Sequence, residues 1–172
     1  ANFMERQEVQ PESNWAFLRE AQTKTLELPN TGMAVIIDIG EAADIHPKNK
    51  KDVGERLWLQ ARKVAYGEKL IASGPNFESF SREGNKLKIK LKSTGDQLKL
   101  KEGEELLGFI LGDSKGNFSS INAELGDDST VLITLPESLN SGEIRYAWAD
   151  NPAVNLVNTI NLPAESFRFK FN

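Results

Sequence analysis

Lysine and aliphatic residues alternate without a break from Lys86 to Lys92, and this alternation constrains the fold more than any other feature of the sequence. Successive side chains of a β-strand point to opposite faces of a sheet. The pattern therefore puts Leu87, Ile89 and Leu91 on an apolar face and the lysines on a charged face. It predicts a strand that covers a core with one side and meets solvent with the other.

Short strands are predicted along the whole chain from residue 76 onward. Apolar or alternating runs recur roughly every 8 to 15 residues, and turn residues such as Gly, Asn and Asp separate them. Besides 86–92 and its continuation at Leu98 and Leu100, we expect strands at 106–111, 118–125, 130–135, 143–149 and 167–171. None of these runs alternates with a helical pattern, which favours an antiparallel β-sandwich over residues 76–172.

The chain up to residue 72 has a different pattern, and we expect a domain boundary between 72 and 76. Apolar residues three and four apart predict helices over 14–26 and 50–66. Between them, residues 33–39 form a continuous apolar run rich in β-branched residues, which is typical of a strand buried on both faces in a parallel sheet. Residues 1–72 are therefore predicted to be part of an α/β domain. One strand makes no sheet, so its neighbours must come from elsewhere in the chain or from a part outside it.

The composition argues against several kinds of partner. A formal net charge of −4 over 172 residues gives no basic face for nucleic acid. The chain has no cysteine and one histidine, so we expect neither a disulfide nor a protein-built zinc site. No apolar run approaches the roughly 20 residues that span a bilayer, and no signal peptide is recognisable at the start. We therefore expect no nucleic acid, no membrane segment and no bound metal.

The single histidine, His46, lies in the loop between the predicted strand at 33–39 and the second helix. Open α/β sheets bind their ligands at the carboxyl ends of strands, where such loops lie. Asp44 stands just before the histidine, and Pro47 fixes the backbone after it. A nearby carboxylate can accept a hydrogen bond from one imidazole nitrogen and leave the other free to take a proton from a nucleophile. From the residues alone, two interpretations remain: a catalytic base, or a surface histidine at the start of a helix.

Several segments resemble the sialate O-acetylesterase family, a branch of the SGNH hydrolases. The most specific are Thr-Gly-Met-Ala-Val-Ile-Ile-Asp-Ile-Gly at 31–40, Asp-Ile-His-Pro-Lys-Asn-Lys at 44–50, Arg-Leu at 56–57 and Ile-Arg-Tyr-Ala-Trp-Ala-Asp-Asn-Pro at 144–152. Residues 15–22 are similar to the helix that precedes the family's strand, and residues 144–168 are similar to its closing β-domain. The resemblance implies a serine esterase. It also implies a fold of two parts, the C-terminal part of a three-layer α/β/α SGNH hydrolase domain and then the antiparallel β-sandwich.

In that family, an Asp-x-x-His block completes a catalytic triad with a serine. The match implies that His46 is the general base and Asp44 its orienting partner. The serine and the oxyanion-hole donors belong to three earlier blocks, none of which is found before Asp44 here. The resemblance thus implies that this chain is the C-terminal portion of the enzyme. We expect it to be nearly inert alone and to need, as partner, the N-terminal portion that carries the serine nucleophile.

Two serines, Ser13 and Ser114, could be taken for the nucleophile from the sequence. Gly112-Asp113-Ser114 spells the family's nucleophile block, but it follows the histidine and lies between predicted strands, so we expect a hairpin turn there. Ser13 has no strand before it and is a favoured residue type at a helix start, so we expect it to cap the first helix.

Smaller predictions concern four other side chains. Asp38 lies within an apolar run, where an acid needs partners, and we expect it to bond backbone amides of residues 40–44; a role in the site itself is the alternative. Arg6 is a candidate for binding the carboxylate of a sialic acid, because a guanidinium suits that group. We expect Tyr146 and Trp148 to divide between the core and the surface, where an exposed ring can stack on a sugar.

Together with the resemblance, these observations predict an esterase that removes O-acetyl groups from sialic acids or related sugars. Its substrate is an acetylated sugar, and it needs no metal or organic cofactor. Acetylxylan or another acetylated polysaccharide is an alternative substrate. A non-catalytic carbohydrate-binding β-sandwich is the alternative from a different functional class. The sequence leaves the compartment undetermined, although the resemblance implies a periplasmic, secreted or lysosomal enzyme.

Overall fold

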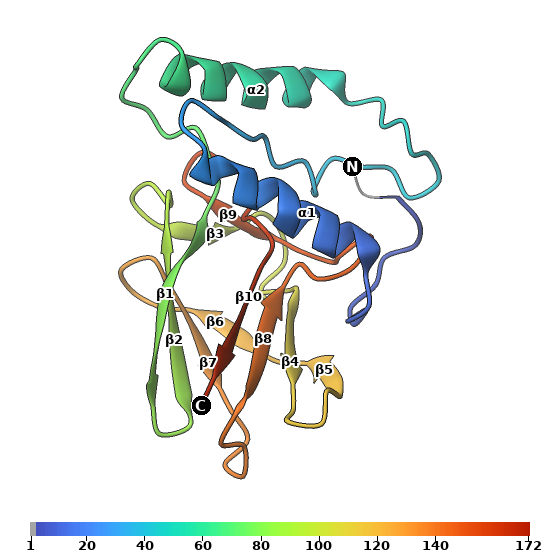
Figure 1. Cartoon of the computed structure of the whole chain (residues 1–172), viewed down its shortest axis with the longest axis vertical. Helices are drawn as coiled ribbons and strands as arrows, with labels where there is room; N and C mark the ends of the chain where they lie inside the picture. Colours follow the sequence, from blue (N-terminus) through green and yellow to red (C-terminus); the bar gives the residue numbers. More distant parts are fainter. Residues whose placement is uncertain (1–2) are drawn as a thin grey trace.

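The structure is a computed structural model that describes residues 3–172. The helices are α1 (Asn14–Lys24), which continues into the 3-10 turn η1 (Thr25–Glu27), and α2 (Lys50–Val64). In Figure 1 the α-helix α2 lies at the top, α1 lies below it, and most of the strands lie below α1. Both predicted helices are confirmed, and their ends differ from the predicted ones by no more than two residues.

Side-chain caps explain where the helices begin. Ser13 Oγ accepts a hydrogen bond of 3.0 Å from the backbone N–H of Ala16, as predicted. Asn49 Oδ1 accepts one of 3.1 Å from the N–H of Asp52 in α2. These bonds satisfy N–H groups of the first helical turn, which have no partner within the helix. Because α2 begins shortly after His46, its cap fixes one end of the histidine loop.

Ten strands are described, and all pairings between them are antiparallel, as predicted. They are β1 (Asn76–Glu83), β2 (Lys86–Lys92), β3 (Leu98–Leu100), β4 (Phe109–Gly112), β5 (Phe118–Ser120), β6 (Ala123–Leu125), β7 (Thr130–Thr134), β8 (Gly142–Tyr146), β9 (Leu156–Asn158) and β10 (Phe167–Phe171). One four-stranded sheet has the order β1-β2-β7-β6 and another the order β10-β8-β4-β5, while β3 pairs with β9.

A single hydrophobic cluster joins the two four-stranded sheets. From β2 it receives Leu87, Ile89 and Leu91, while the lysines between them are exposed, so the alternation predicted for this strand is confirmed. The other sheet contributes Tyr146 and Phe167, whose rings stack with their centroids 5.4 Å apart. Removal of these apolar faces from water favours the packing of one sheet against the other.

Several strands differ from the prediction: β1 is not among the predicted strands, and β4 begins at Phe109 instead of residue 106. The run at 118–125 is divided between β5 and β6, which belong to different sheets, because the chain crosses from one sheet to the other at residues 121–122. The run at 143–149 ends at Tyr146, because Ala147 has a left-handed φ of 54° that a regular strand does not contain. Strand β9 is too short to give a recognisable alternation, and the sequence does not predict it.

The strand predicted at 33–39 is the main correction. Residues 33–36 have no regular secondary structure, and residues 37–39 form a turn. Hydrogen bonds to a neighbouring strand hold a strand in place, and all ten strands of the described residues pair within the three sheets above. Val35 nevertheless packs against the core, so this segment lies on the β-rich part of the chain. The three-layer α/β/α arrangement stays a prediction.

Packing also crosses the predicted domain boundary. Arg19 of α1 donates hydrogen bonds to the carbonyl oxygens of Ala147 (2.8 Å) and Ala149 (2.6 Å). Ile37 belongs to the hydrophobic cluster of the sheets. The division into residues 1–72 and 76–172 stays a prediction. Neither helix of the described chain is long and apolar enough to cross a membrane.

Candidate active site

The loop of residues 40–49 carries both predicted catalytic side chains. Glu41 shapes it: its carbonyl accepts a 3.2 Å hydrogen bond from the N–H of Asp44, and its carboxylate accepts a 2.7 Å bond from the N–H of Lys48. The Nζ of Lys48 lies 3.8 Å from the same carboxylate. The loop therefore folds on itself and presents Asp44 and His46 between these two residues.

Asp44 and His46 lie close together, but the carboxylate holds the backbone of His46 and not its ring. Asp44 Oδ1 accepts a 2.8 Å hydrogen bond from the His46 N–H, whereas His46 Nδ1 lies 3.6 Å from that oxygen. Only one residue separates the two, one fewer than in the Asp-x-x-His block with which the segment is compared. At this short spacing the carboxylate reaches the amide first, and the predicted hydrogen bond to the ring is not formed.

The imidazole of His46 faces solvent. Its side chain is 87% exposed, and that of Asp44 is 45% exposed. A general base needs a nucleophile within about 3 Å, and no hydroxyl group of residues 3–172 is hydrogen-bonded to this ring. The described part of the chain therefore offers a histidine and a carboxylate without a nucleophile beside them.

The segment of residues 3–10 contacts this loop at Met4. The N–H of Met4 donates a 2.9 Å hydrogen bond to the carbonyl of Ala42, and Asn151 Nδ2 donates a 2.7 Å bond to the carbonyl of Met4. Arg6 follows two residues later and is exposed. The fold thus attaches the Arg6 segment to the histidine loop, although none of the described contacts joins Arg6 to His46.

Asp38, at the base of the loop, is held by two cations. Arg56 of α2 binds both carboxylate oxygens, at 2.6 and 2.9 Å, and Lys101 Nζ lies 3.0 Å from one of them. Burial opposes the charge of Asp38, but the hydrogen bonds and charges of Arg56 and Lys101 lower the pKa of its carboxyl. The prediction that backbone amides of the loop bind the Asp38 carboxylate is therefore wrong. A signal for Arg56 was present in the sequence, because it is a cation on the helix that directly follows the loop.

The two serines that imitate a nucleophile have structural roles, as predicted. Ser13 is buried and caps α1, and its hydroxyl donates a 2.6 Å hydrogen bond to Asp150 Oδ1. Ser114 lies in the turn between β4 and β5, where Asp113 Oδ1 accepts a 2.9 Å bond from the N–H of Asn117. Within residues 3–172, neither hydroxyl is hydrogen-bonded to His46.

Tyr146 and Trp148 are both buried, so neither ring is on the surface. Tyr146 belongs to the main cluster between the sheets, whereas Trp148 belongs to a second cluster that contains Ala16 of α1. The ring of Phe17 meets that of Trp148 edge-on, with centroids 5.3 Å apart. The prediction that one of the two rings stacks on a sugar is wrong, because α1 covers the indole.

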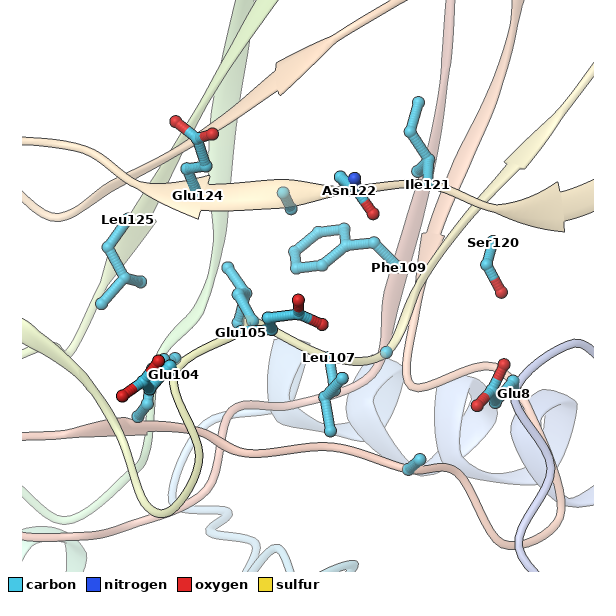
Figure 2. A pocket seen from close by; sticks show the side chains of 15 residues that line it. Glu8, Glu104, Glu105, Leu107, Phe109, Ser120, Ile121, Asn122, Glu124 and Leu125 are labelled. Atoms are coloured by element: carbon cyan, nitrogen blue, oxygen red, sulfur yellow. The ribbon is translucent and has the colours of Figure 1, made fainter.

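A cavity of about 630 Å³ lies between the edges of the sheets, and no residue of the 40–49 loop lines it. Figure 2 shows Glu104, Glu105 and Glu124 around this cavity, and Glu8 at its end. No lysine or arginine is among the lining residues. Because four carboxylates repel an anionic sugar, we do not assign a sialate substrate to this cavity.

Known proteins resemble this chain over most of its length. No protein-family model matches it. Human sialate O-acetylesterase is 31% identical over 134 residues, which are 73% of this chain and 25% of the human protein. The solved structure of a carbohydrate acetylesterase from Xanthomonas citri is 41% identical and covers 98% of this chain, with a TM-score of 0.87. The chain belongs to the sialate O-acetylesterase family.

The chain spans about a quarter of the length of the curated sialate O-acetylesterases that it matches, and 39% of the Xanthomonas citri chain. The rat sialate O-acetylesterase is 30% identical over 135 residues, again 73% of this chain. The family predicted from the sequence is therefore confirmed. The names of these relatives describe acetylesterases.

Proposed function

We propose that this chain contributes the general base, His46, to an esterase that removes O-acetyl groups from sialic acids or related sugars. One observation carries the proposal. The chain belongs to an acetylesterase family, and its only histidine is exposed on a loop that hydrogen bonds of Glu41 hold in shape. The nucleophilic serine belongs to an N-terminal portion of the same enzyme. The greater length of the curated relatives is consistent with such a portion.

In the proposed reaction, the serine oxygen attacks the carbonyl carbon of the acetyl group while His46 takes the serine proton. The tetrahedral intermediate expels the sugar oxygen, which receives that proton, and the acetyl group stays on the serine. Water then attacks the acetyl-serine with His46 as base, acetate leaves, and the proton returns to the serine oxygen. This scheme uses no metal or organic cofactor.

Asp44 is proposed to steady the imidazolium. Its Oδ1 is 3.6 Å from His46 Nδ1, so an approach of about 0.5 Å would form a hydrogen bond. The same oxygen already holds the His46 N–H at 2.8 Å, which fixes the backbone that carries the ring. Because the pair is exposed, its attraction is weak in water and strengthens when another surface covers it.

The N-terminal portion is proposed to add strands beside residues 33–39 and so to complete a three-layer α/β/α domain. This segment is bonded to α2 through Arg56, which donates a 2.7 Å hydrogen bond to the carbonyl of Val35. On α2 the side chains of Leu57 and Trp58 are exposed, and the ring of Tyr66 packs on Trp58 with centroids 5.7 Å apart. Exposed apolar groups of this size favour a protein partner over solvent.

Arg6 is proposed to bind the substrate carboxylate, because a guanidinium meets a carboxylate with two parallel hydrogen bonds. Its segment is attached to the histidine loop through the Met4–Ala42 bond. Arg6→Gln should therefore lower kcat/KM for an O-acetylated sialic acid and leave kcat/KM for acetylated xylooligosaccharides unchanged. An equal loss on both substrates would contradict this role and favour a structural one.

The test of the proposed function is acetate release from an O-acetylated sialic acid. The samples are this chain alone, this chain combined with an N-terminal portion from a family member, and the same combination with His46→Ala. We expect activity in the second sample only. Ser114→Ala in the combined sample is the matched control and should keep full activity, because this serine lies in a hairpin turn.

Each other outcome has a definite meaning. Unchanged activity with His46→Ala would show that His46 is not the general base. Activity of the chain alone would remove the need for a second portion. Binding of acetylated sugar by the combined sample without acetate release would favour the carbohydrate-binding module instead of the enzyme.

A further inference from the structure

We propose that Asp38 and Arg56 are positioning residues that hold the two ends of the His46 loop, and that Lys101 couples this clamp to the β-rich part of the chain. The inference rests on the proposed function of His46. The position of the His46 loop can nevertheless be measured in this chain without substrate. None of the three residues takes part in a chemical step.

Asp38 and Arg56 stand on either side of the segment that carries His46. Asp38 comes just before the loop of residues 40–49, and Arg56 lies on α2, just after it. Arg56 donates hydrogen bonds of 2.6 and 2.9 Å to the two oxygens of Asp38, and a third of 2.7 Å to the carbonyl of Val35. These bonds close the loop at its base, so its two ends cannot separate without breaking them.

The clamp is buried, and the loop that it closes is not. The side chains of Asp38 and Arg56 are 7% and 10% exposed, whereas that of His46 is 87% exposed. Charges shielded from water attract each other more strongly than exposed ones. A bidentate guanidinium–carboxylate pair also restricts angle as well as distance. The position of the exposed loop is therefore set from its buried base.

Lys101 brings a second cation to Asp38 from a distant part of the sequence. Its Nζ lies 3.0 Å from Asp38 Oδ2, and its backbone N–H donates a 2.8 Å hydrogen bond to the carbonyl of Asn155. Lys101 directly follows β3 and Asn155 directly precedes β9, and these two strands are paired. The lysine is thus anchored in the β-rich part and reaches the base of the histidine loop, so the β-rich part helps to hold that loop.

The first test uses NMR of this chain, in which His46 is the only histidine and gives a single set of imidazole signals. Lys101→Met removes one cation of the clamp and keeps a long side chain, and the fold should persist because Lys101 is 41% exposed. We expect the imidazole signals of His46 to shift. We also expect its backbone N–H to lose protection against hydrogen exchange, because the bond from this N–H to Asp44 depends on the position of the loop.

Lys99→Met is the matched control. It removes the same charge two residues away, where the lysine Nζ donates a 2.9 Å hydrogen bond to the carbonyl of Thr159 and does not touch Asp38. The His46 signals should stay as in the wild type. An equal shift in the Lys99 and Lys101 variants would overturn the proposal, because it would show a general effect of charge.

Arg56→Lys tests the bidentate contact between Arg56 and Asp38, since lysine keeps the charge but lacks the planar guanidinium that binds both carboxylate oxygens. We expect a larger shift of the His46 signals than with Lys101→Met. If folded Arg56→Lys and Lys101→Met both keep the wild-type signals and exchange rate, the proposal is wrong. If Arg56→Lys does not fold, the result for Lys101→Met decides alone.

The second test uses the combined enzyme. Lys101→Met should lower kcat about ten- to a hundred-fold with little change in KM, because a displacement of about 1 Å can cost a reacting group about a hundred-fold in rate. Lys99→Met should leave kcat unchanged. A shift of the His46 signals without a fall in kcat would contradict a positioning role. An active His46→Ala enzyme would defeat the proposed function, and the NMR results would still decide whether the clamp holds the loop.

Discussion

Glu165 carries a largely buried carboxyl group that no cation of residues 3–172 binds through a hydrogen bond. The residue is buried in the connection between β9 and β10 and lines a cavity of about 380 Å³ between α1 and residues 32–37. Within residues 3–172, its side chain has no hydrogen bond or ion pair. Arg19 lines the same cavity, but its guanidinium donates to Ser166 and to backbone carbonyls. We predict that Glu165→Gln stabilises the protein at alkaline pH and not at acidic pH.

The magnitude follows from the pKa of this group. Burial raises the pKa of Glu165 from 4.5 to about 7, and the charge of Lys92 opposes this rise only in part. Each pKa unit corresponds to about 1.4 kcal/mol, so the charged carboxylate costs the folded state about 3 kcal/mol. The unfolded chain releases this proton at lower pH than the folded chain does. The cost is therefore absent below pH 4.5, grows as the pH rises and is complete above about pH 7.

The assay is urea unfolding followed by tryptophan fluorescence, which gives the free energy of unfolding. At about pH 8 the variant should be more stable than the wild type by about 3 kcal/mol, or about 6 to 12 °C in Tm for a chain of this size. At about pH 4 the two proteins should agree. Glu137→Gln removes an exposed carboxylate and should change neither value. An equal gain at both pH values would refute the reasoning, because the gain would then not arise from ionisation.

Three further substitutions are measured by the same unfolding experiment. Ser13→Ala should cost about 1 to 2 kcal/mol, because α1 loses its cap and Asp150 loses a partner; no loss would contradict the cap. Ile133→Ala should cost about 2 to 5 kcal/mol, because this side chain fills the core between the sheets, and a loss below about 1 kcal/mol would mean that the core is loosely packed there. Ser114→Ala should change the free energy by less than about 0.5 kcal/mol, since Asp113 forms the bonds of the turn; a larger loss would give the serine a role that the hairpin does not explain.

Features that depend on neighbours in the sequence could be predicted. The alternation from Lys86 to Lys92 specifies both faces of a strand, and the burial of Leu87 and Ile89 follows from a period of two. Ser13 needs only the N–H three residues ahead to act as a cap. The histidine loop was located for the same reason, because the apolar run before it and the helix after it are both local patterns.

Features that depend on distant residues could not be predicted. A local pattern can mark residues 33–39 as suited to a strand, but it cannot supply the neighbouring strand that would make them one. The partners of Asp38 stand 18 and 63 residues further along the chain, so its ion pairs follow from tertiary packing. The burial of Trp148 likewise results from contact with Phe17 of α1. The contact of Lys101 with Asp38 is thus visible only once the chain is folded, whereas the place of Arg56 on the helix after the loop was a signal in the sequence.

The exposure of His46 indicates what a completed site must provide. Water screens the charge that develops on an imidazolium or an oxyanion, so acyl transfer gains little from an exposed ring. In the proposed assembly, the second portion must therefore cover the ring and exclude water as well as bring a serine within about 3 Å of it. Leu57 and Trp58 are exposed on the helix next to the loop, and their burial by that portion is favourable. In the proposed assembly, the same docking step that removes these apolar groups from water also desolvates His46, so association and activation are coupled.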